Sequence, residues 1–168
     1  GYADGSGKTV WIIDTGVDLD HPDLNVNASR SKSFIPGTTP DDDHGHGTHV
    51  AGTIAAKNNN RGVIGVAANA EIISLKVMDQ NGKGSTAKII EAVNYVAQNG
   101  KAGDVVNLSV SGDPSEILDK AVSDAADKGI LFSIAAGNYA KDVSGSSPAR
   151  VNNQNVFTVS AMDLSLIH

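Results

Sequence analysis

The sequence predicts an α/β fold in three layers, with a mostly parallel, doubly wound sheet between helices. Short apolar runs typical of buried strands alternate with segments of helical periodicity along the 168 residues. Only 4% of the residues are aromatic, against 40% hydrophobic residues overall, so we expect a core of Val, Ile, Leu and Ala. The length fits one domain.

The expected strands share a pattern of four or more apolar residues in a short run. The first, from Thr9 to Asp14, ends in a carboxylate that is followed by Thr15 and Gly16. Similar runs follow at 71–77, 105–110, 130–135 and 156–161. In open parallel sheets the site lies beyond the carboxyl ends of the strands, which is where this pattern places Asp14.

Helices are expected between these strands. One begins near His46, and a second spans residues 85–99, with Gly100 placed to end it. The run Asp113-Pro114-Ser115-Glu116 indicates a capping box with proline at the first helical position of a third helix, which ends before Gly129.

The overall charge and composition exclude several classes of partner. The formal net charge is −6 and the Lys and Arg residues are scattered, so we expect no nucleic-acid partner. No apolar run approaches the length of a membrane span, so we expect no membrane partner. The chain has no cysteine, which excludes disulfides and thiolate chemistry. It begins with Gly rather than Met, so we expect the natural protein to begin earlier.

The residue pattern around His46 points to a general base. Gly45 and Gly47 flank the imidazole and would allow another chain to approach it closely, and Asp14 is a candidate to orient it. The segment around Asp14, taken alone, favours an aspartate that accepts backbone hydrogen bonds from the following turn.

A metal site is the alternative for the same region. Three histidines and three aspartates lie close together in the sequence, but neither a HExxH motif nor a cysteine accompanies them, which disfavours metal catalysis. These residues are His44, His46, His49, Asp41, Asp42 and Asp43. We expect His21 to be structural and His168 to be unstructured.

Two motifs resemble those of the subtilisin-like serine proteases (subtilases, peptidase family S8). Asp14-Thr15-Gly16-Val17-Asp18 matches the aspartate motif, and His46-Gly47-Thr48-His49-Val50-Ala51-Gly52 matches the histidine motif. The resemblance runs from about residue 9 to 162. It implies a subtilisin-type fold, incomplete at the C-terminus, with Asp14 as orienting group and His46 as general base. It also implies a secreted, extracellular endopeptidase that acts on polypeptides and has a propeptide as a further partner.

The resemblance assigns further site residues. Asn138 corresponds to the side-chain donor of the oxyanion hole. Two segments correspond to those that pair with substrate backbone, and a third to a wall of the pocket for the residue before the cut. They are Gly82, Lys83 and Gly84; Ser109, Val110, Ser111 and Gly112; and Ala136 with Gly137. Ser111 departs from the glycine usual at its position and would either narrow the cleft or alter the strand pairing.

A structural calcium ion is the one cofactor that the resemblance suggests, and none is expected for catalysis. The ligands would be Asp23 and the side chain of Asn59, with backbone carbonyls of Lys57, Arg61 and Val63. Only one of these residues is a carboxylate, and a plain Asn-rich turn accounts for the same residues equally well.

No serine stands in the Gly-Thr-Ser setting of the family's nucleophile. Ser144, Ser146 and Ser147 lie in a Gly/Ser loop, and Ser109 fits the substrate-binding strand better. Residues 1–168 are therefore interpreted as the N-terminal part of a catalytic domain, inactive alone, with surfaces left uncovered. Residues 164–168 leave the family pattern and are a candidate for a non-native tail.

Two alternative functions remain open at this stage. One is a catalytically dead, subtilase-like module that binds peptides. The other is a phosphoacceptor receiver-type domain, which also places an Asp at a strand end in a doubly wound sheet but would leave the His46 motif unexplained.

Overall fold

A single parallel sheet organises the computed structural model, which describes residues 4–138 and 142–161. The strand order is β2-β4-β1-β5-β6-β7, and β3 also pairs with β4. The strands are β1 (Thr9–Asp14), β2 (Asn25–Val26), β3 (Lys32–Ser33), β4 (Glu71–Lys76), β5 (Val105–Leu108), β6 (Leu131–Ala135) and β7 (Val156–Val159). The helices are α1 (His46–Ala55), α2 (Thr86–Asn99) and α3 (Glu116–Ala126), with a 3-10 turn η1 (Val143–Gly145).

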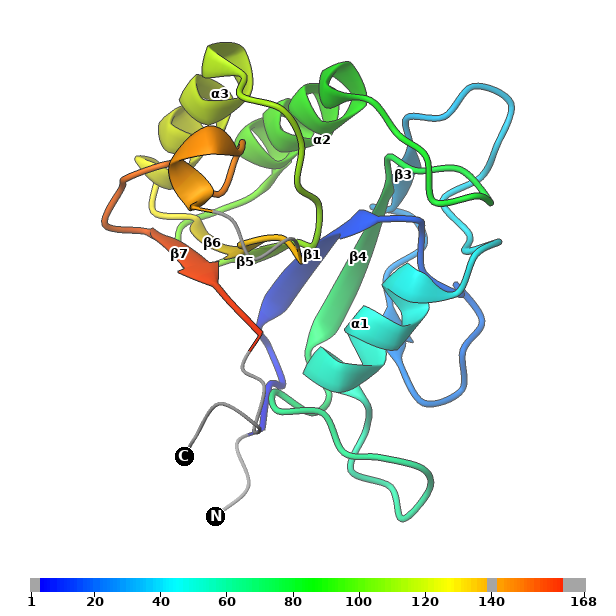
Figure 1. Ribbon diagram of the computed structural model, residues 1–168. Coiled ribbons are helices and arrows are strands. Elements are labelled where there is room, and N and C mark those ends of the chain that lie inside the picture. Colours follow the sequence, from blue (N-terminus) through cyan, green and yellow to red (C-terminus); the bar gives the residue numbers. More distant parts are fainter. Residues whose placement is uncertain (1–3, 139–141, 162–168) are drawn as a thin grey trace, which may run out of the picture.

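The helices lie on both faces of the sheet, as a doubly wound fold requires. Figure 1 shows α2 and α3 together on one side and α1 on the other. Two hydrophobic clusters correspond to these faces, one shared with α2 and α3 and one with α1. The expected three-layer α/β class with a mostly parallel sheet is confirmed, because every strand pair in the described ranges is parallel. None of the helices described is both long and apolar enough to span a membrane.

Strand β1 is buried along its whole length, and its alternation decides where Asp14 points. Trp11 and Ile13 belong to the cluster under α2 and α3, whereas Val10 and Ile12 belong to the cluster under α1. Successive side chains of a strand point to opposite faces. Asp14, two residues after Ile12, therefore lies on the α1 face.

The chain reverses its winding direction at β1. It passes from β1 through α1 to β4 on one side, and then through α2 to β5 on the other side of β1. Asp14 is in register with Lys76 at the end of β4, and Ile13 is in register with Leu108 at the end of β5. The carboxyl ends of these three strands thus meet at the topological switch point, where α/β sheets bind ligands.

Several element boundaries differ from those expected. Strands β4, β5 and β7 end one to two residues before the predicted ends, at Lys76, Leu108 and Val159. Strand β6 begins at Leu131 rather than at residue 130. The predicted capping box at residues 113–116 is wrong. The side chain of Ser115 caps α3 by accepting a hydrogen bond from the backbone N–H of Leu118, so Pro114 lies before the helix and not in its first turn.

The α1 face is incompletely covered over β5, β6 and β7. Helix α1 packs on β1 and β4, and no other helix of the described residues lies on this side. Phe157 and Val159 lie two residues apart on the terminal strand β7, and therefore on the same face of the sheet. They have 55% and 56% of their surface exposed. An exposed apolar edge strand is a template for association with another chain.

We expect the 168-residue chain to self-associate through β7. Phe157→Lys should weaken the association at least about fivefold, because it replaces exposed apolar surface with a charge at the sheet edge. Sedimentation equilibrium measures the effect, with Ile117→Lys as the matched control, since Ile117 is 71% exposed but lies on α3. A monomeric wild-type chain, or an equal effect of both variants, would contradict the prediction.

Candidate active site

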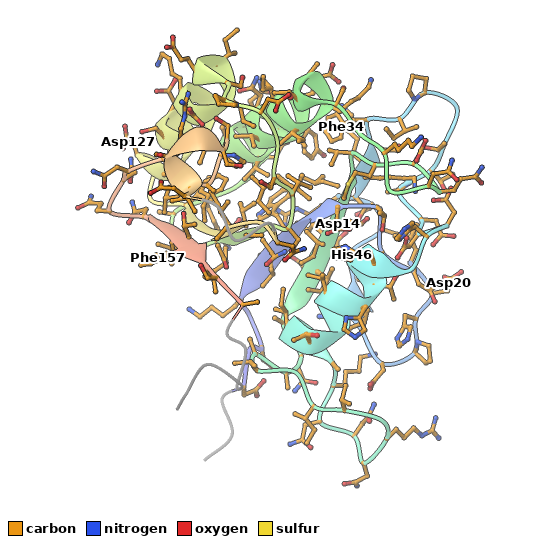
Figure 2. All side chains as sticks on the ribbon, in the orientation of Figure 1. Asp14, Asp20, Phe34, His46, Asp127 and Phe157 are labelled. Carbon is orange, nitrogen blue, oxygen red and sulfur yellow. The ribbon has the colours of Figure 1, made fainter. Side chains whose placement is uncertain are left out.

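The structure brings the two residues of the predicted acid–base pair into contact. Nδ1 of His46 lies 2.7 Å from Oδ1 of Asp14, and Figure 2 shows the two side chains together where β1 ends and α1 begins. Asp14 has no exposed side-chain surface, whereas His46 is 47% exposed. A carboxylate that accepts from Nδ1 holds the imidazole in the tautomer whose Nε2 can accept a proton. His46 is therefore an oriented base at an accessible surface.

Both contacts expected of Asp14, with the imidazole and with the following turn, are present. Its Oδ1 accepts a hydrogen bond from the backbone N–H of Thr15 at 2.7 Å as well as from His46. Its Oδ2 is buried without a hydrogen-bond partner among the described residues. A receiver-type phosphoacceptor needs a carboxylate open to a phosphodonor, so the complete burial of Asp14 argues against that function.

A network centred on Asp42 fixes the start of α1, a role that was not predicted for this residue. The Asp42 carboxylate accepts from the backbone N–H and the hydroxyl of Thr48 and from the backbone N–H of Gly45. It also accepts from the hydroxyl of Thr15, whose oxygen accepts in turn from the backbone N–H of Gly47. Asp42 thus takes the role of helix cap that Gly45, the N-cap residue, cannot perform.

Asp42 stays ionised across the neutral range. Burial by itself would raise its pKa, but hydrogen bonds from the Thr48 hydroxyl and from the backbone N–H groups of Gly45, Thr48 and His44 outweigh it and lower the pKa to about 2. A carboxyl group with a lowered pKa stabilises the fold above its unfolded-state pKa and loses that contribution as the pH falls. The anchoring of α1 is therefore complete above about pH 4 and weakens toward pH 2.

The two glycines that flank His46 serve different purposes. A Cβ on Gly47 would lie 2.0 Å from the carbonyl oxygen of Gly16 and 3.1 Å from the Cβ of Asp14. Only glycine therefore allows α1 to approach the turn after β1 closely enough for the Asp14–His46 contact. Gly45 has no neighbour within 4 Å of such a Cβ, but its φ of +100° is a left-handed conformation that favours glycine.

Lys76 is a second supporting residue that was not predicted. It ends β4 in register with Asp14 and is fully buried. Its Nζ donates to the carbonyl oxygen of Thr15 at 2.5 Å and forms an ion pair with the Asp43 carboxylate. Lys76 therefore joins the turn after Asp14 to the segment before His46. A lysine at the end of an otherwise apolar strand, beside the aspartate strand, was the available signal.

The first predicted substrate segment lies near His46. Residues 78–84 form a tight turn in which Asp79 and Lys83 are joined by a backbone hydrogen bond of 2.9 Å. Gly82 lies at the tip, and a Cβ there would be 3.3 Å from Nε2 of His44. The His44 and His46 rings have centroids 6.4 Å apart. Gly82 is thus adjacent to His44, two residues before the histidine motif.

The second and third predicted segments lie beyond the ends of β5 and β6. Ser109, Val110, Ser111 and Gly112 follow β5, and Ala136, Gly137 and Asn138 follow β6. Asn138 is exposed. A Cβ on Gly137 would lie 3.3 Å from Oγ of Ser111, so the ends of the two segments are in contact. The sheet thus presents all three predicted segments at the edge that carries Asp14.

The described serines do not contact the base. Ser109 Oγ accepts from the Asn107 side chain, Ser146 Oγ bonds to Ser111, and the buried Ser147 accepts from the backbone N–H of Ser115. In residues 4–138 and 142–161 no serine hydroxyl is hydrogen-bonded to His46. The proposed tail at 164–168 lies outside the described residues.

Part of the predicted calcium loop contacts Asp23. Its Oδ1 accepts from the Asn59 side chain at 2.7 Å, its carbonyl oxygen accepts from the Lys57 N–H, and Asn59 Oδ1 accepts from the Arg61 N–H. A Cβ on Gly62 would lie 3.6 Å from Oδ2 of Asp23, so the loop backbone wraps around the carboxylate. The contacts of Asp23 with Asn59 and Lys57 come from N–H groups and not from the predicted ligand oxygens, so calcium binding here stays a prediction. Across the described part of the chain, no three His, Asp or Glu side chains converge to hold a metal, which leaves the metal alternative at His44, His46 and His49 without support.

Comparison with known proteins identifies relatives of this chain. A model of the subtilase family matches residues 5–165. The subtilase-type proteinase psp3 of Schizosaccharomyces pombe is 42% identical over 154 residues, which cover 89% of this chain and 33% of that protein. An alkaline protease of Alkalihalobacillus alcalophilus is 46% identical over 151 residues, which cover 89% of this chain and 38% of the relative.

The fold has a solved counterpart. The crystal structure of a cold adapted subtilisin-like serine proteinase matches with a TM-score of 0.75 and 40% sequence identity. The match covers 89% of this chain and 53% of that chain. The chain thus spans between a third and about half of the length of these relatives.

Proposed function

Because the chain belongs to the subtilase family, we propose that the full-length protein is a serine endopeptidase that uses Asp14, His46 and a serine outside residues 1–168. The observation that carries this proposal is the 2.7 Å contact between a fully buried Asp14 and a half-exposed His46. The contact lies at the switch point of the sheet, where substrates bind in α/β folds. Polypeptides are the proposed substrates.

Each residue has a defined task in this reaction. His46 Nε2 takes the proton of the serine hydroxyl as its oxygen attacks the peptide carbonyl carbon, and Asp14 stabilises the imidazolium that forms. His46 then gives the proton to the leaving amine, and an acyl-enzyme remains. Water attacks the acyl group with His46 again as base, which releases the second product and restores the serine.

The remaining predicted residues hold the substrate and stabilise charge. We propose that Asn138 donates a hydrogen bond to the oxyanion of the tetrahedral intermediate, which its exposed position after β6 supports. The substrate backbone would lie between Gly82-Lys83-Gly84 and Ser109–Gly112, with Ala136 and Gly137 at the pocket for the residue before the cut.

Hydrolysis of a peptide p-nitroanilide tests the proposal. We expect the full-length protein to release nitroaniline and the 168-residue chain alone to be inactive, since loss of the serine costs about 10⁶-fold in subtilisin. Full-length protein that binds the peptide without hydrolysing it would instead be a catalytically dead binding module. Hydrolysis by the purified 168-residue chain would contradict the assignment of the serine to another part of the protein.

We further propose that Asp23 and residues 57–63 hold a structural calcium ion. Because Asp23 is the one carboxylate, we expect a dissociation constant for calcium of about 10⁻³ M, in the range of weak extracellular sites. About 10 mM CaCl₂ should then raise the melting temperature of the chain by about 3–6 °C, because the ion binds only the folded state. Thermal unfolding followed by circular dichroism measures this shift.

A test variant and a matched control decide whether the shift in melting temperature comes from calcium bound at this loop. Asp23→Asn should abolish it, whereas Asp20→Asn, which removes an exposed carboxylate three residues earlier, should retain it. Equal shifts in all three proteins, or none in the wild type, would contradict the calcium proposal.

The resemblance also supports proposals about location and processing. We propose that the protein acts outside the cell and is made with a propeptide that occupies its substrate groove before removal. N-terminal sequencing of the mature protein from culture medium tests both points. A protein retained in the cell with its leading segment intact would contradict them.

A further inference from the structure

A pocket of about 390 Å³ lies beyond the ends of β5 and β6, next to the proposed substrate groove. Ser111 and Asp113 line it on the side of β5, Ala136 on the side of β6, and Asp142 and Ser146 from the segment around η1. Ala136 and Ser111 belong to segments already assigned to substrate. The side chain before the scissile bond would therefore enter this pocket.

The walls of the pocket are joined across a narrow space. Gly112 and Ser147 exchange two backbone hydrogen bonds of 3.0 and 3.1 Å. The hydroxyls of Ser111 and Ser146 lie 2.8 Å apart, and Ser111 Oγ is 3.3 Å from the site of a Cβ on Gly137. The serine at 111 thus takes up room that a glycine would leave open. A narrow pocket favours an unbranched side chain over a broad aromatic ring.

The pocket carries two carboxylates. Asp113 and Asp142 both line it and are exposed. The backbone N–H of Ser144 donates to Asp142 Oδ1 at 2.8 Å. This bond, followed by one from the Ser144 hydroxyl, holds the pKa of Asp142 below its usual value. The Asp142 carboxylate therefore stays ionised at neutral pH.

We infer that this pocket selects Lys or Arg as the residue before the scissile bond, an inference that rests on the proposed peptidase function. The aliphatic stem of either residue can lie along the pocket wall that Ser111 and Ser146 form, and its charged end can pair with Asp113 and Asp142. The substrates would then be polypeptides cut after basic residues.

Ligand binding to the 168-residue chain tests the pocket without any catalysis. Butylguanidinium and butylurea have nearly the same shape but differ in charge. We expect the amide NMR signals of Ser111, Gly112 and Gly145 to shift with butylguanidinium at about fivefold or more lower concentration than with butylurea. Asp142→Asn should remove most of this difference, because asparagine can still accept from Ser144 but carries no charge. Equal binding of both probes would contradict the inference.

Peptide hydrolysis by the full-length protein tests the same pocket in the reaction. Two p-nitroanilides that differ only in Lys or norleucine before the cut should show a higher kcat/KM for Lys. Asp113→Asn and Asp142→Asn should each lower that ratio about fivefold. Asp20→Asn, an exposed carboxylate that does not line the pocket, should leave the ratio unchanged.

The two tests separate failure of this inference from failure of the proposed function. Hydrolysis that favours norleucine over Lys would contradict the charge selection and leave the peptidase function intact. Absence of hydrolysis of either peptide would contradict the peptidase function, and the binding of butylguanidinium over butylurea would then decide the charge of the pocket on its own.

Discussion

Replacing His46 with alanine in the full-length protein is expected to lower kcat about 10⁶-fold, the loss seen when subtilisin loses its catalytic histidine. The physical reason is that the serine hydroxyl then has no base within reach, and the leaving amine has no acid. Steady-state hydrolysis of a peptide p-nitroanilide measures the loss, and KM should change far less than kcat. His49→Ala is the matched control, because His49 is an exposed histidine on the same helix.

The dependence of His46 on Asp14 makes this prediction sharper. Asp14→Asn alone should lower kcat about 10⁴-fold, since an amide cannot hold the imidazole in the right tautomer. The double variant should be no slower than His46→Ala, because the two residues act as one unit through their 2.7 Å contact. Multiplicative losses, or an effect of His49→Ala as large as that of His46→Ala, would contradict these roles.

Replacing Lys76 with alanine is expected to destabilise the 168-residue chain by about 3–5 kcal/mol. The substitution leaves a cavity where a fully buried side chain lay and removes the donor to the Thr15 carbonyl oxygen and the partner of Asp43. A loss of this size is a large part of the stability of a single domain. Urea unfolding followed by circular dichroism measures it.

Two further variants separate the sources of the Lys76 effect. Lys76→Met keeps most of the buried volume but not the ammonium group, so it should recover part of the unfolding free energy that Lys76→Ala loses. The part that it does not recover measures the contribution of the hydrogen bond and the ion pair of Lys76. Lys120→Ala removes a lysine that is 74% exposed and pairs with Asp124 on the surface, and it should change stability by less than about 0.5 kcal/mol. A cost below about 1 kcal/mol for Lys76→Ala would show that Lys76 does not hold the site together.

Local signals predicted the central elements of the fold. Strand β1 was predicted at its observed bounds, because a fully buried parallel strand appears as an unbroken apolar run. Helix α2 was predicted within one residue, since Ser85 caps it and Gly100 ends it. The strands β2 and β3 were not predicted. Each has two residues, and each is defined only by pairing with the distant β4.

The contact between Asp14 and His46 was predictable, but the residues that support it were not. Asp14 and His46 stand in motifs whose residue types already indicate their chemistry. Lys76, in contrast, acts through the carbonyl oxygen of Thr15 and the carboxylate of Asp43, and Asp42 acts through N–H groups at the start of α1. Such contacts depend on the packing of distant segments, so the sequence around these residues carries only a weak signal.

Covalent labelling with a fluorophosphonate probe tests the central claim most directly, because the probe reacts with a serine only when an oriented base activates it. The full-length protein, its His46→Ala variant and the 168-residue chain are labelled in parallel, and the modified residue is located by mass spectrometry. We predict stoichiometric labelling of the full-length protein at one serine outside residues 1–168, and no labelling of the other two. A labelled serine within residues 1–168, or labelling that survives His46→Ala, would contradict the account.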